Sequence, residues 1–364
     1  MQPTPDGPRA GEDSRATLDD EPLVALDEIR AAAGRLRGIT LRTPLLRFGA
    51  PLLSDPQGRT RAWLKPENLQ PIGAFKLRGA YNALSRLSDE QRARGVVTAS
   101  SGNHGQGVAR AARLLGIRAV VVMPSDTPQV KISGVESDGA EIVLVGPTSQ
   151  ERIGRAREMA EADGSAFIHS YDQRDIISGQ GTAGLEIAED MTALQDPPGG
   201  SFPAGPFTVL VPIGGGGLAS GVATAVKSMR PDAIVLGVEP AFAADARQSL
   251  DEDRIVSWTA EQVARTSADG MRTTALGRLT FRHLRHWLDG VVVVEETEIL
   301  RAMLRAQRAA RIVLEPSGAT TLAAWLFHAT DLPPEGPVVC LLSGGNVDPL
   351  AYAGWLAMAE AAGG

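Results

Sequence analysis

The sequence predicts an α/β fold with largely parallel sheets. Short β-rich runs alternate with helical stretches along the chain, and strands in such an order form parallel sheets. The runs are nearly all apolar, as expected of strands that are covered on both faces. At 364 residues, the chain is long enough for about two domains. The predicted strands are residues 62–64, 95–97, 119–122, 142–145, 208–211, 234–236, 291–294 and 338–342.

The ordered part of the chain is expected to begin near residue 23. Residues 1–22 are rich in Pro, Gly, Asp and Glu and hold few apolar residues, so ordering them would cost entropy without burying a core. We therefore expect a disordered tail. Leu23, Leu26, Ile29 and Ala33 then follow at helical spacing.

The composition excludes several classes of protein. With 36 Lys and Arg against 43 Asp and Glu, the net charge of −7 offers no basic surface for nucleic acid. No apolar run reaches the roughly 18 residues of a membrane span, and the N-terminus lacks a basic stretch followed by an apolar one. We expect a cytoplasmic protein without nucleic-acid or membrane partners. The single cysteine, Cys340, lies in a predicted buried strand, which favours a packed thiol over a nucleophile.

The first segment that can carry chemistry is the turn around Lys76, one of only four lysines in the chain. Lys76 follows Phe75 and opens an apolar helix, where the helix dipole disfavours a cation. The dipole and desolvation both favour the neutral amine, which is the form that attacks an aldehyde. A lone lysine at a helix start would ordinarily keep its ammonium group in water. A chemical role for Lys76 is therefore favoured only together with the motifs described next.

A second segment, residues 98–107, lies between the predicted strand 95–97 and a helix expected over 108–115. Small residues at such a turn leave backbone N–H groups free to bind an anion such as a carboxylate. The side chains available for a substrate are those of Ser100, Ser101, Asn103 and His104. Ordinary N-capping is the alternative explanation for Ser100 and Asn103.

A third segment is rich in glycine and also joins a strand to a helix, which is expected over residues 219–229. It consists of Gly214, Gly215, Gly216, Gly217 and Leu218. Such a loop lets a phosphate approach successive N–H groups closely, without showing which phosphate it is. It also fits a dinucleotide fingerprint, with Glu239 as the ribose ligand, so this loop taken alone also fits a nicotinamide enzyme.

Finally, Ser343 follows the last predicted strand, where ligands collect in parallel sheets; a simple turn serine is the alternative.

Together these segments resemble the fold-type II pyridoxal-phosphate family, which includes threonine/serine dehydratases, serine racemase and hydroxyaspartate dehydratases. The similarity runs from residue 43 to about residue 348, with the motifs in the family's order. It implies pyridoxal 5'-phosphate held by Lys76 as a Schiff base, with Phe75 beside it and the phosphate in the glycine loop. It further implies that Asn103 bonds the ring hydroxyl and that Ser343 faces the pyridine nitrogen. The dinucleotide alternative leaves Lys76, Asn103 and Ser343 without a role.

The resemblance also implies an organisation into two domains, each with a largely parallel twisted sheet flanked by helices. Residues 23–94 and 173–364 would form a large cofactor-binding domain, and residues 95–172 a small mobile one. The family's usual assembly is a homodimer. The chain ends 18 residues after Asn346, from which we expect no regulatory domain of the kind found in isoleucine-sensitive relatives and no inhibition by isoleucine.

The activity that the resemblance implies is a lyase reaction on a small amino acid. L-threonine or L-serine would lose its β-hydroxyl and then ammonia, giving 2-oxobutanoate or pyruvate, with Lys76 as tether and base. Two departures from the family are Ala74, where many members have serine, and Ser101, where some dehydratases have alanine. In racemase-like members, a serine at the position of Ser101 passes a proton opposite the lysine. Serine racemisation and hydroxyaspartate dehydration therefore stay open, as does a non-catalytic role.

A metal site is the last expectation. The two carboxylates of Glu239 and Asp245 stand six residues apart across a proline turn, with the carbonyl of Ala243 between them. Oxygen ligands of this kind suit Mg²⁺ or Ca²⁺. Racemase-like relatives bind a divalent metal at the matching glutamate, alanine carbonyl and aspartate. Surface acidic residues in a solvated loop are the alternative.

Overall fold

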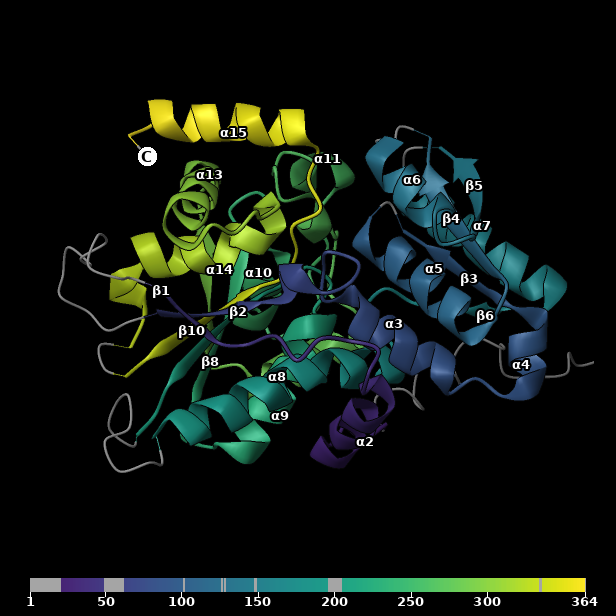
Figure 1. Cartoon of the computed structure of the whole chain (residues 1–364), viewed down its shortest axis with the longest axis horizontal. Helices are drawn as coiled ribbons and strands as arrows, with labels where there is room; N and C mark the ends of the chain where they lie inside the picture. The colour runs from purple at the N-terminus through teal and green to yellow at the C-terminus, as the bar shows by residue number, and fades with distance from the viewer. Residues whose placement is uncertain are drawn as a thin grey trace, which may run out of the picture.

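A computed structural model of the chain contains two sheets flanked by helices (Figure 1). It describes residues 21–48, 62–100, 102–125, 127, 129–146, 149–195, 205–333 and 336–363. The expected tail over residues 1–20 and most of the connection at 196–206 lie outside these ranges. Within them, none of the helices combines the length and the apolar character that crossing a bilayer requires.

The larger sheet has six strands in the order β1-β2-β10-β7-β8-β9. β1 pairs with β2 in antiparallel fashion and the other pairings are parallel. The strands are β1 (Leu46–Phe48), β2 (Ala62–Pro66), β7 (Thr208–Pro212), β8 (Ile234–Pro240), β9 (Gly290–Val294) and β10 (Val338–Leu342). The smaller sheet is entirely parallel, in the order β5-β4-β3-β6. Its strands are β3 (Val96–Ala99), β4 (Ala119–Pro124), β5 (Glu141–Val145) and β6 (Ala166–Phe167).

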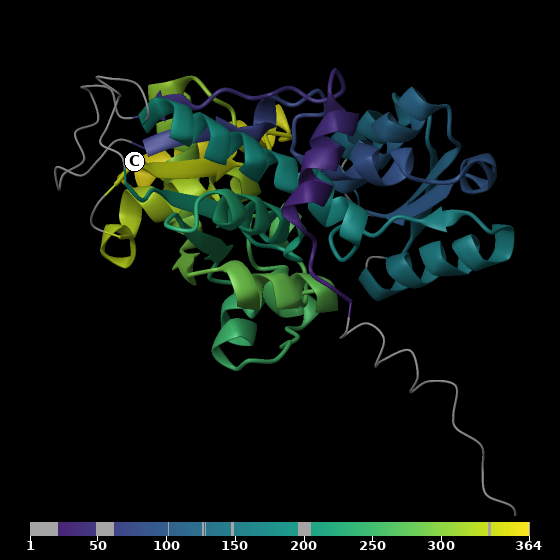
Figure 2. The ribbon, with the colours of Figure 1, turned by 90° about the horizontal axis from the view of Figure 1, so that it is seen from below.

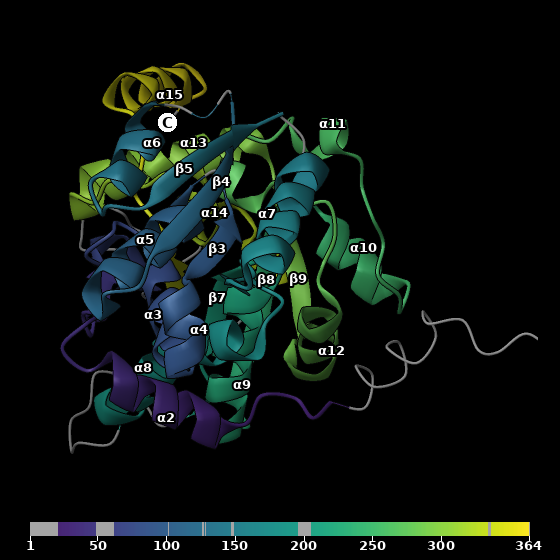
Figure 3. The same ribbon diagram turned by 90° about the vertical axis from the view of Figure 1, so that its right-hand side faces the viewer.

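Helices cover both faces of each sheet, as Figures 1 and 3 show. Those around the smaller sheet are α5 (Asn103–Leu115), α6 (Gln129–Glu136) and α7 (Ser149–Asp163), with α4 (Asp89–Arg94) preceding it. Those of the larger part are α2 (Leu26–Leu36), α3 (Lys76–Ser85), α8 (Arg174–Gln195), α9 (Gly217–Met229), α10 (Asp245–Asp251), α11 (Ala260–Val263), α12 (Arg278–Trp287), α13 (Glu296–Arg305), α14 (Pro316–Phe327) and α15 (Pro349–Ala361). Short 3-10 turns are η1 (Glu67–Leu69), η2 (Asp269–Met271) and η4 (Ala329–Asp331), and a π turn, η3 (Ala306–Ala310), extends α13.

The larger sheet is buried on both faces, which explains its nearly continuous apolar strands. In β10, Cys340 and Leu342 pack into a core with α13 and α14, whereas Val339 and Leu341 pack into a second core with α8 and α9. The thiol of Cys340 is fully buried, and this burial raises its pKa above the ordinary range. The expectation of a packed thiol is therefore confirmed.

Three local expectations differ from the structure. β5 is an edge strand with Leu144 half exposed, so the expectation of coverage on both faces is wrong there. The helix expected from residue 108 begins at Asn103, and the one expected from residue 219 begins at Gly217. In both helices the N-cap residue is a glycine, Gly102 or Gly216.

α3 and α8 lie where the two parts of the molecule meet (Figures 1 and 2). Leu77 and Leu84 of α3 share one apolar core with Val108 of α5 and Ile176 of α8. The first residue of α3, Lys76, therefore stands at the boundary between elements of the two sheets. The division into a large and a small mobile domain stays a prediction.

Candidate active site

A cavity of about 700 Å³ lies at this boundary. Its walls come from the start of α3, the turn between β3 and α5, the loop between β7 and α9 and the residue after β10. These positions follow the carboxyl ends of parallel strands or open a helix, where ligands bind in α/β proteins. The predicted residues that line the cavity are Phe75, Lys76, Ser100, Asn103, His104, Gly214, Gly215, Gly216, Gly217, Leu218 and Ser343. Ser101 lies outside the described residues.

Lys76 reaches into the cavity from the first turn of α3. Its Nζ donates to the backbone oxygen of Ser170 at 2.8 Å and lies 5.1 Å from the centre of the Phe75 ring. Burial lowers the pKa of Lys76 to about 8, because a charged ammonium group loses hydration there. The neutral amine is therefore more populated near neutral pH than in an exposed lysine, the direction that the sequence predicted.

The turn that carries Lys76 is joined to the loop that carries Ser343. Ala74 and Gly344 form an antiparallel bridge, in which the backbone N–H of Phe75 donates to the Ser343 oxygen at 3.1 Å. The N–H of Gly345 donates to the Gly73 oxygen at 2.9 Å. Segments about 270 residues apart thus hold the lysine and the serine on one wall of the cavity.

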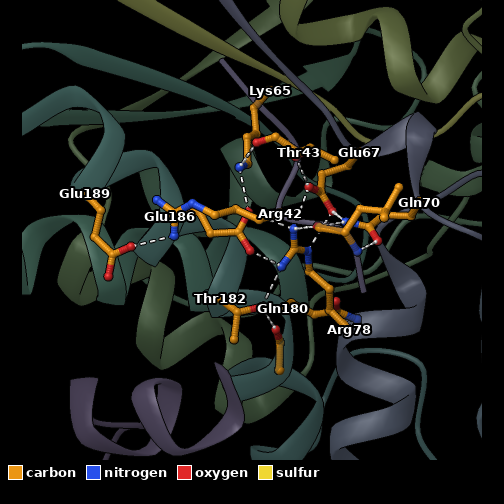
Figure 4. Close-up of polar contacts among 12 residues, drawn as sticks. Arg42, Thr43, Lys65, Glu67, Gln70, Arg78, Gln180, Thr182, Glu186 and Glu189 are labelled. Atoms are coloured by element: carbon orange, nitrogen blue, oxygen red, sulfur yellow. Dashed lines mark hydrogen bonds and ion pairs between the residues drawn. The ribbon is translucent and has the colours of Figure 1, made fainter. Parts of the chain in front are cut away.

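Buried ion pairs fix the orientation of α3 two residues beyond Lys76 (Figure 4). The guanidinium of Arg78, 1% exposed, donates to both carboxylate oxygens of Glu67 at 2.7 and 2.8 Å. It also donates to both oxygens of Glu186 on α8, at 2.7 and 2.9 Å. Lys65 of β2, fully buried, donates to Glu186 at 2.6 Å and to the Thr43 oxygen at 2.6 Å. Two cations and two anions therefore balance within the network.

This network favours the charged state of Glu67. Burial alone would raise the pKa of Glu67, but the adjacent Arg78 and Lys65 outweigh burial and hold that pKa below its ordinary value. The hydroxyl of Thr43 adds a hydrogen bond to Glu67 at 2.7 Å. Arg78 therefore anchors the helix that begins at Lys76.

The turn before α5 and the first residues of that helix bring Asn103 and His104 to the cavity, and the two side chains have different hydrogen-bond partners. Nδ2 of Asn103 donates to Oε1 of Glu315 at 2.7 Å, and Oδ1 of Asn103 accepts from Asn346 at 2.9 Å. His104 is buried, with Nε2 3.4 Å from the Ile168 oxygen. Burial, together with the charge of Lys76, lowers the pKa of His104 well below its usual range. His104 is therefore a neutral imidazole and brings no positive charge to a carboxylate.

Two positions of the glycine loop leave no room for a side chain. A Cβ on Gly215 would overlap the ring of Tyr171, and one on Gly217 would lie 2.9 Å from the Tyr171 Cα. Gly216 has φ of +92°, which glycine adopts without strain. The loop ends at the N-terminus of α9, whose first N–H groups have no helical acceptor. The arrangement suits the binding of a phosphate.

Several residues at the cavity were missed at the sequence level. The backbone oxygen of Ser317 accepts a hydrogen bond from the hydroxyl of Ser343 at 3.4 Å. Glu315 precedes α14 and is 3% exposed; burial and the charge of Asp269 raise its pKa to about 8. Lys131 of α6 forms an ion pair with Asp269 of η2, which joins elements around the two sheets. The Glu315-Pro316 pair before an apolar run marks a helix start, but nothing in the sequence relates it to Asn103.

The three residues of the predicted metal site, Glu239, Ala243 and Asp245, are buried and do not line this cavity. Glu239 lies within β8, which runs four residues further than the predicted strand 234–236. Its two oxygens accept from the N–H groups of Ala246 and Arg247 at 2.9 and 2.7 Å. Asp245 is 1% exposed. Burial raises the pKa of Asp245 to about 7; burial and the nearby Asp245 together raise that of Glu239 strongly. The alternative of a solvated surface loop is wrong, and Glu239 is too enclosed to reach a ribose.

The family model described as pyridoxal-phosphate dependent enzyme matches residues 36–344. The chain therefore belongs to that family, and the expected cofactor class and fold are confirmed. It is 40% identical to an L-threonine ammonia-lyase of Thermotoga maritima over 328 residues. This matched region covers 90% of this chain and 76% of the relative.

Two solved structures extend the similarity to three dimensions. A threonine deaminase, from the organism abbreviated T.th., has a TM-score of 0.80 at 44% identity, covering 89% of this chain and 99% of that one. Maize serine racemase has a TM-score of 0.81 at 35% identity, covering 94% of this chain and 99% of that one.

We expect Arg78→Met to lower the free energy of unfolding by about 3–5 kcal/mol, because it removes the cation that pairs with the buried carboxylate of Glu67. The matched control is Arg30→Met, which breaks an ion pair whose side chains are 56% and 90% exposed. Its loss should stay below about 1 kcal/mol. Urea unfolding measures both variants, and equal losses would contradict the anchoring role of Arg78.

Proposed function

We propose that the protein is a pyridoxal-phosphate-dependent ammonia-lyase acting on L-threonine or L-serine. The products are 2-oxobutanoate or pyruvate, together with ammonia. The observation that carries the proposal is that Lys76, with a lowered pKa, lines one cavity with the glycine loop, Asn103 and Ser343. Similarity to threonine ammonia-lyase and threonine deaminase supports this substrate class.

The residues of the cavity fit the cofactor. The glycine loop offers N–H groups and space to a phosphate, and Lys76 offers an amine that reacts with an aldehyde. Nδ2 of Asn103 can donate to the ring hydroxyl, and the hydroxyl of Ser343 can face the pyridine nitrogen. When bound, the cofactor supplies an electron-withdrawing ring that stabilises negative charge at the substrate Cα.

With the cofactor bound, the protein's own residues would have the following roles in the reaction. Lys76 first holds the cofactor and, once displaced, takes the proton from the substrate Cα, since its amine is largely neutral at mildly alkaline pH. The turn at Ser100, Asn103 and His104 holds the substrate carboxylate through backbone N–H groups and side chains. A neutral hydroxyl at Ser343, unlike a carboxylate, leaves the pyridine nitrogen largely unprotonated, which favours β-elimination over transamination.

Serine racemisation is the second candidate. Similarity to maize serine racemase supports it, as does Ser101, which in that reaction would pass a proton on the face opposite Lys76. Formation of D-serine from L-serine would favour this second candidate. Dehydration of hydroxyaspartate would need a further cation. Lys131, Arg152 and Arg272 also line the cavity and carry the required charge.

A substrate panel tests the activity. Incubated with L-threonine, L-serine, D-serine and hydroxyaspartate, the enzyme should release ketoacid from L-threonine or L-serine, without forming D-serine from L-serine. Lys76→Ala should lose the visible absorbance of the lysine-bound cofactor and lower the rate at least about a hundredfold. Lys227→Ala is the control, because Lys227 pairs with Asp289 outside the cavity. Ketoacid release at the wild-type rate by Lys76→Ala would refute the assignment.

We also propose that Glu239, Asp245 and the carbonyl of Ala243 bind Mg²⁺ or Ca²⁺ in a structural role. The supporting observation is that Oδ2 of Asp245 is buried without a hydrogen-bond partner among the described residues. Two buried carboxylates close together are costly unless protonated or balanced by a cation. Hard oxygen donors suit these two ions, with water completing the coordination.

Chelation should therefore lower the thermal midpoint of unfolding, and added Mg²⁺ or Ca²⁺ should restore it. At a cation concentration of 100 times Kd, the stabilisation is about 2.7 kcal/mol. Asp245→Asn should no longer respond, whereas Asp331→Asn, a change at a surface acid, should respond like the wild type. A wild-type protein whose midpoint is indifferent to chelator and cation would remove the site.

A homodimer and a cytoplasmic location are proposed as well. The dimer is supported by three exposed apolar side chains around η1, namely Leu41, Leu69 and Val313, which are 51%, 48% and 45% exposed. Gln70 exchanges hydrogen bonds with the Leu41 backbone, and Asn68 donates to the Val313 oxygen at 3.2 Å, so the three positions adjoin. Twofold dimers are the commonest symmetric assembly, and a second copy can cover such a patch.

Sedimentation should give the mass of two chains for the wild type. Leu69→Asp combined with Val313→Asp should shift it toward one chain, because the substitutions place charges in the contact. Leu144→Asp is the matched control, since Leu144 is 52% exposed on β5, away from this patch. A wild type of one-chain mass, or a double variant that stays dimeric, would contradict the proposed interface.

A further inference from the structure

A chain of hydrogen bonds between side chains runs along one wall of the cavity. Nδ2 of Asn346 donates to the backbone oxygen of Ile72 at 2.7 Å and to Oδ1 of Asn103 at 2.9 Å. Nδ2 of Asn103 donates in turn to Oε1 of Glu315 at 2.7 Å. The chain connects the turn before α3, the loop after β10, the first residue of α5 and the residue before α14.

The direction of this chain is determined at its Ile72 end. A backbone carbonyl can only accept a hydrogen bond, so the amide of Asn346 must face Ile72 with its nitrogen. The second hydrogen of that nitrogen is directed to Oδ1 of Asn103. The amide of Asn103 then has its oxygen toward Asn346 and its nitrogen toward Glu315. A longer contact of 3.4 Å from Nδ2 of Asn346 to Oε1 of Gln106 agrees with this assignment.

Glycines provide the space that the chain occupies. A Cβ on Gly73 would overlap Oδ1 of Asn346, and a Cβ on Gly344 would overlap Oε1 of Glu315. Glu315 itself is 3% exposed, so water competes little for its oxygen. The backbone is thus shaped around the side chains of Asn346 and Glu315.

We propose that Glu315 is a positioning residue that, together with Asn346, holds the amide of Asn103 with an N–H group toward the cofactor's ring oxygen. Of the two hydrogens on Nδ2 of Asn103, one bonds Glu315 and the other is available to the cavity. Without an acceptor at position 315, the Asn103 amide can rotate and turn its oxygen toward the ring oxygen, where two acceptors repel. The inference rests on the proposed placement of the cofactor ring against Asn103.

A double-mutant cycle tests whether Glu315 acts through Asn103. The affinity of the cofactor-free protein for pyridoxal phosphate is measured by absorbance titration for Asn103→Ala, Glu315→Ala and the double variant. Each single change should weaken binding about five- to tenfold, the loss of one hydrogen bond. The double variant should bind no more weakly than Asn103→Ala alone. The absorbance maximum of the bound cofactor should shift in the same direction in both single variants.

Conservative and control variants separate positioning from folding. Glu315→Gln keeps an oxygen that can accept from Asn103, so its affinity should stay within about twofold of the wild type. Asn346→Ala removes the donor to Oδ1 of Asn103 and should reproduce the loss, which provides a second arm if Glu315→Ala does not fold. Glu298→Ala is the control, because this glutamate of α13 pairs with His328 outside the cavity. Its affinity should not change.

The outcomes distinguish this inference from the proposed placement of the cofactor. If Asn103→Ala binds the cofactor as tightly as the wild type, that placement is wrong and the role of Glu315 is wrong with it. If Asn103→Ala weakens binding but the Glu315→Ala and Asn103→Ala effects add fully in the double variant, only the role of Glu315 is overturned. Non-additive losses, with recovery in Glu315→Gln, support it.

Discussion

The burial of Arg78 is the constraint on which the arrangement of the active site depends. Its guanidinium contacts Glu67 from η1 and Glu186 from α8, two elements that are far apart in the sequence. An uncompensated charge in this environment would be strongly destabilising, so α3, η1 and α8 have to meet in one arrangement. Since Lys76 precedes Arg78 by two residues in the same helix, that arrangement also fixes the position of the Lys76 backbone at the cavity.

A second constraint is the junction between the turn before α3 and the loop after β10. The backbone bonds from Phe75 to Ser343 and from Gly345 to Gly73 place Lys76 and Ser343 on one wall. The glycine loop and the turn at Asn103 complete the cavity from other strands. Because these groups come from elements of both sheets, the shape of the site depends on how the two parts pack against each other.

The cavity and the buried acid pair of Glu239 and Asp245 differ in their electrostatics. In the cavity, burial shifts Lys76 toward its neutral form and Glu315 toward its protonated form, so both groups can lose or gain a proton near neutral pH. At Glu239 and Asp245, no arginine makes a side-chain contact comparable to that of Arg78 among the described residues. The cavity suits proton transfer by Lys76, whereas the two acids at Glu239 and Asp245 are costly unless they are protonated or balanced by a cation.

The sequence by itself determined the elements whose signal is local. The apolar strands, the four motif segments and the family resemblance located Lys76, Asn103, Ser343 and the glycine loop, because strand, turn and helix start are contiguous there. Tertiary structure decided what depends on distant contacts: the exposure of β5 at a sheet edge, the anchoring of α3 by Glu186, and the approach of Glu315 to Asn103 across 212 residues. Burial sets the pKa values of Lys76 and Glu315, and burial exists only once the elements have packed.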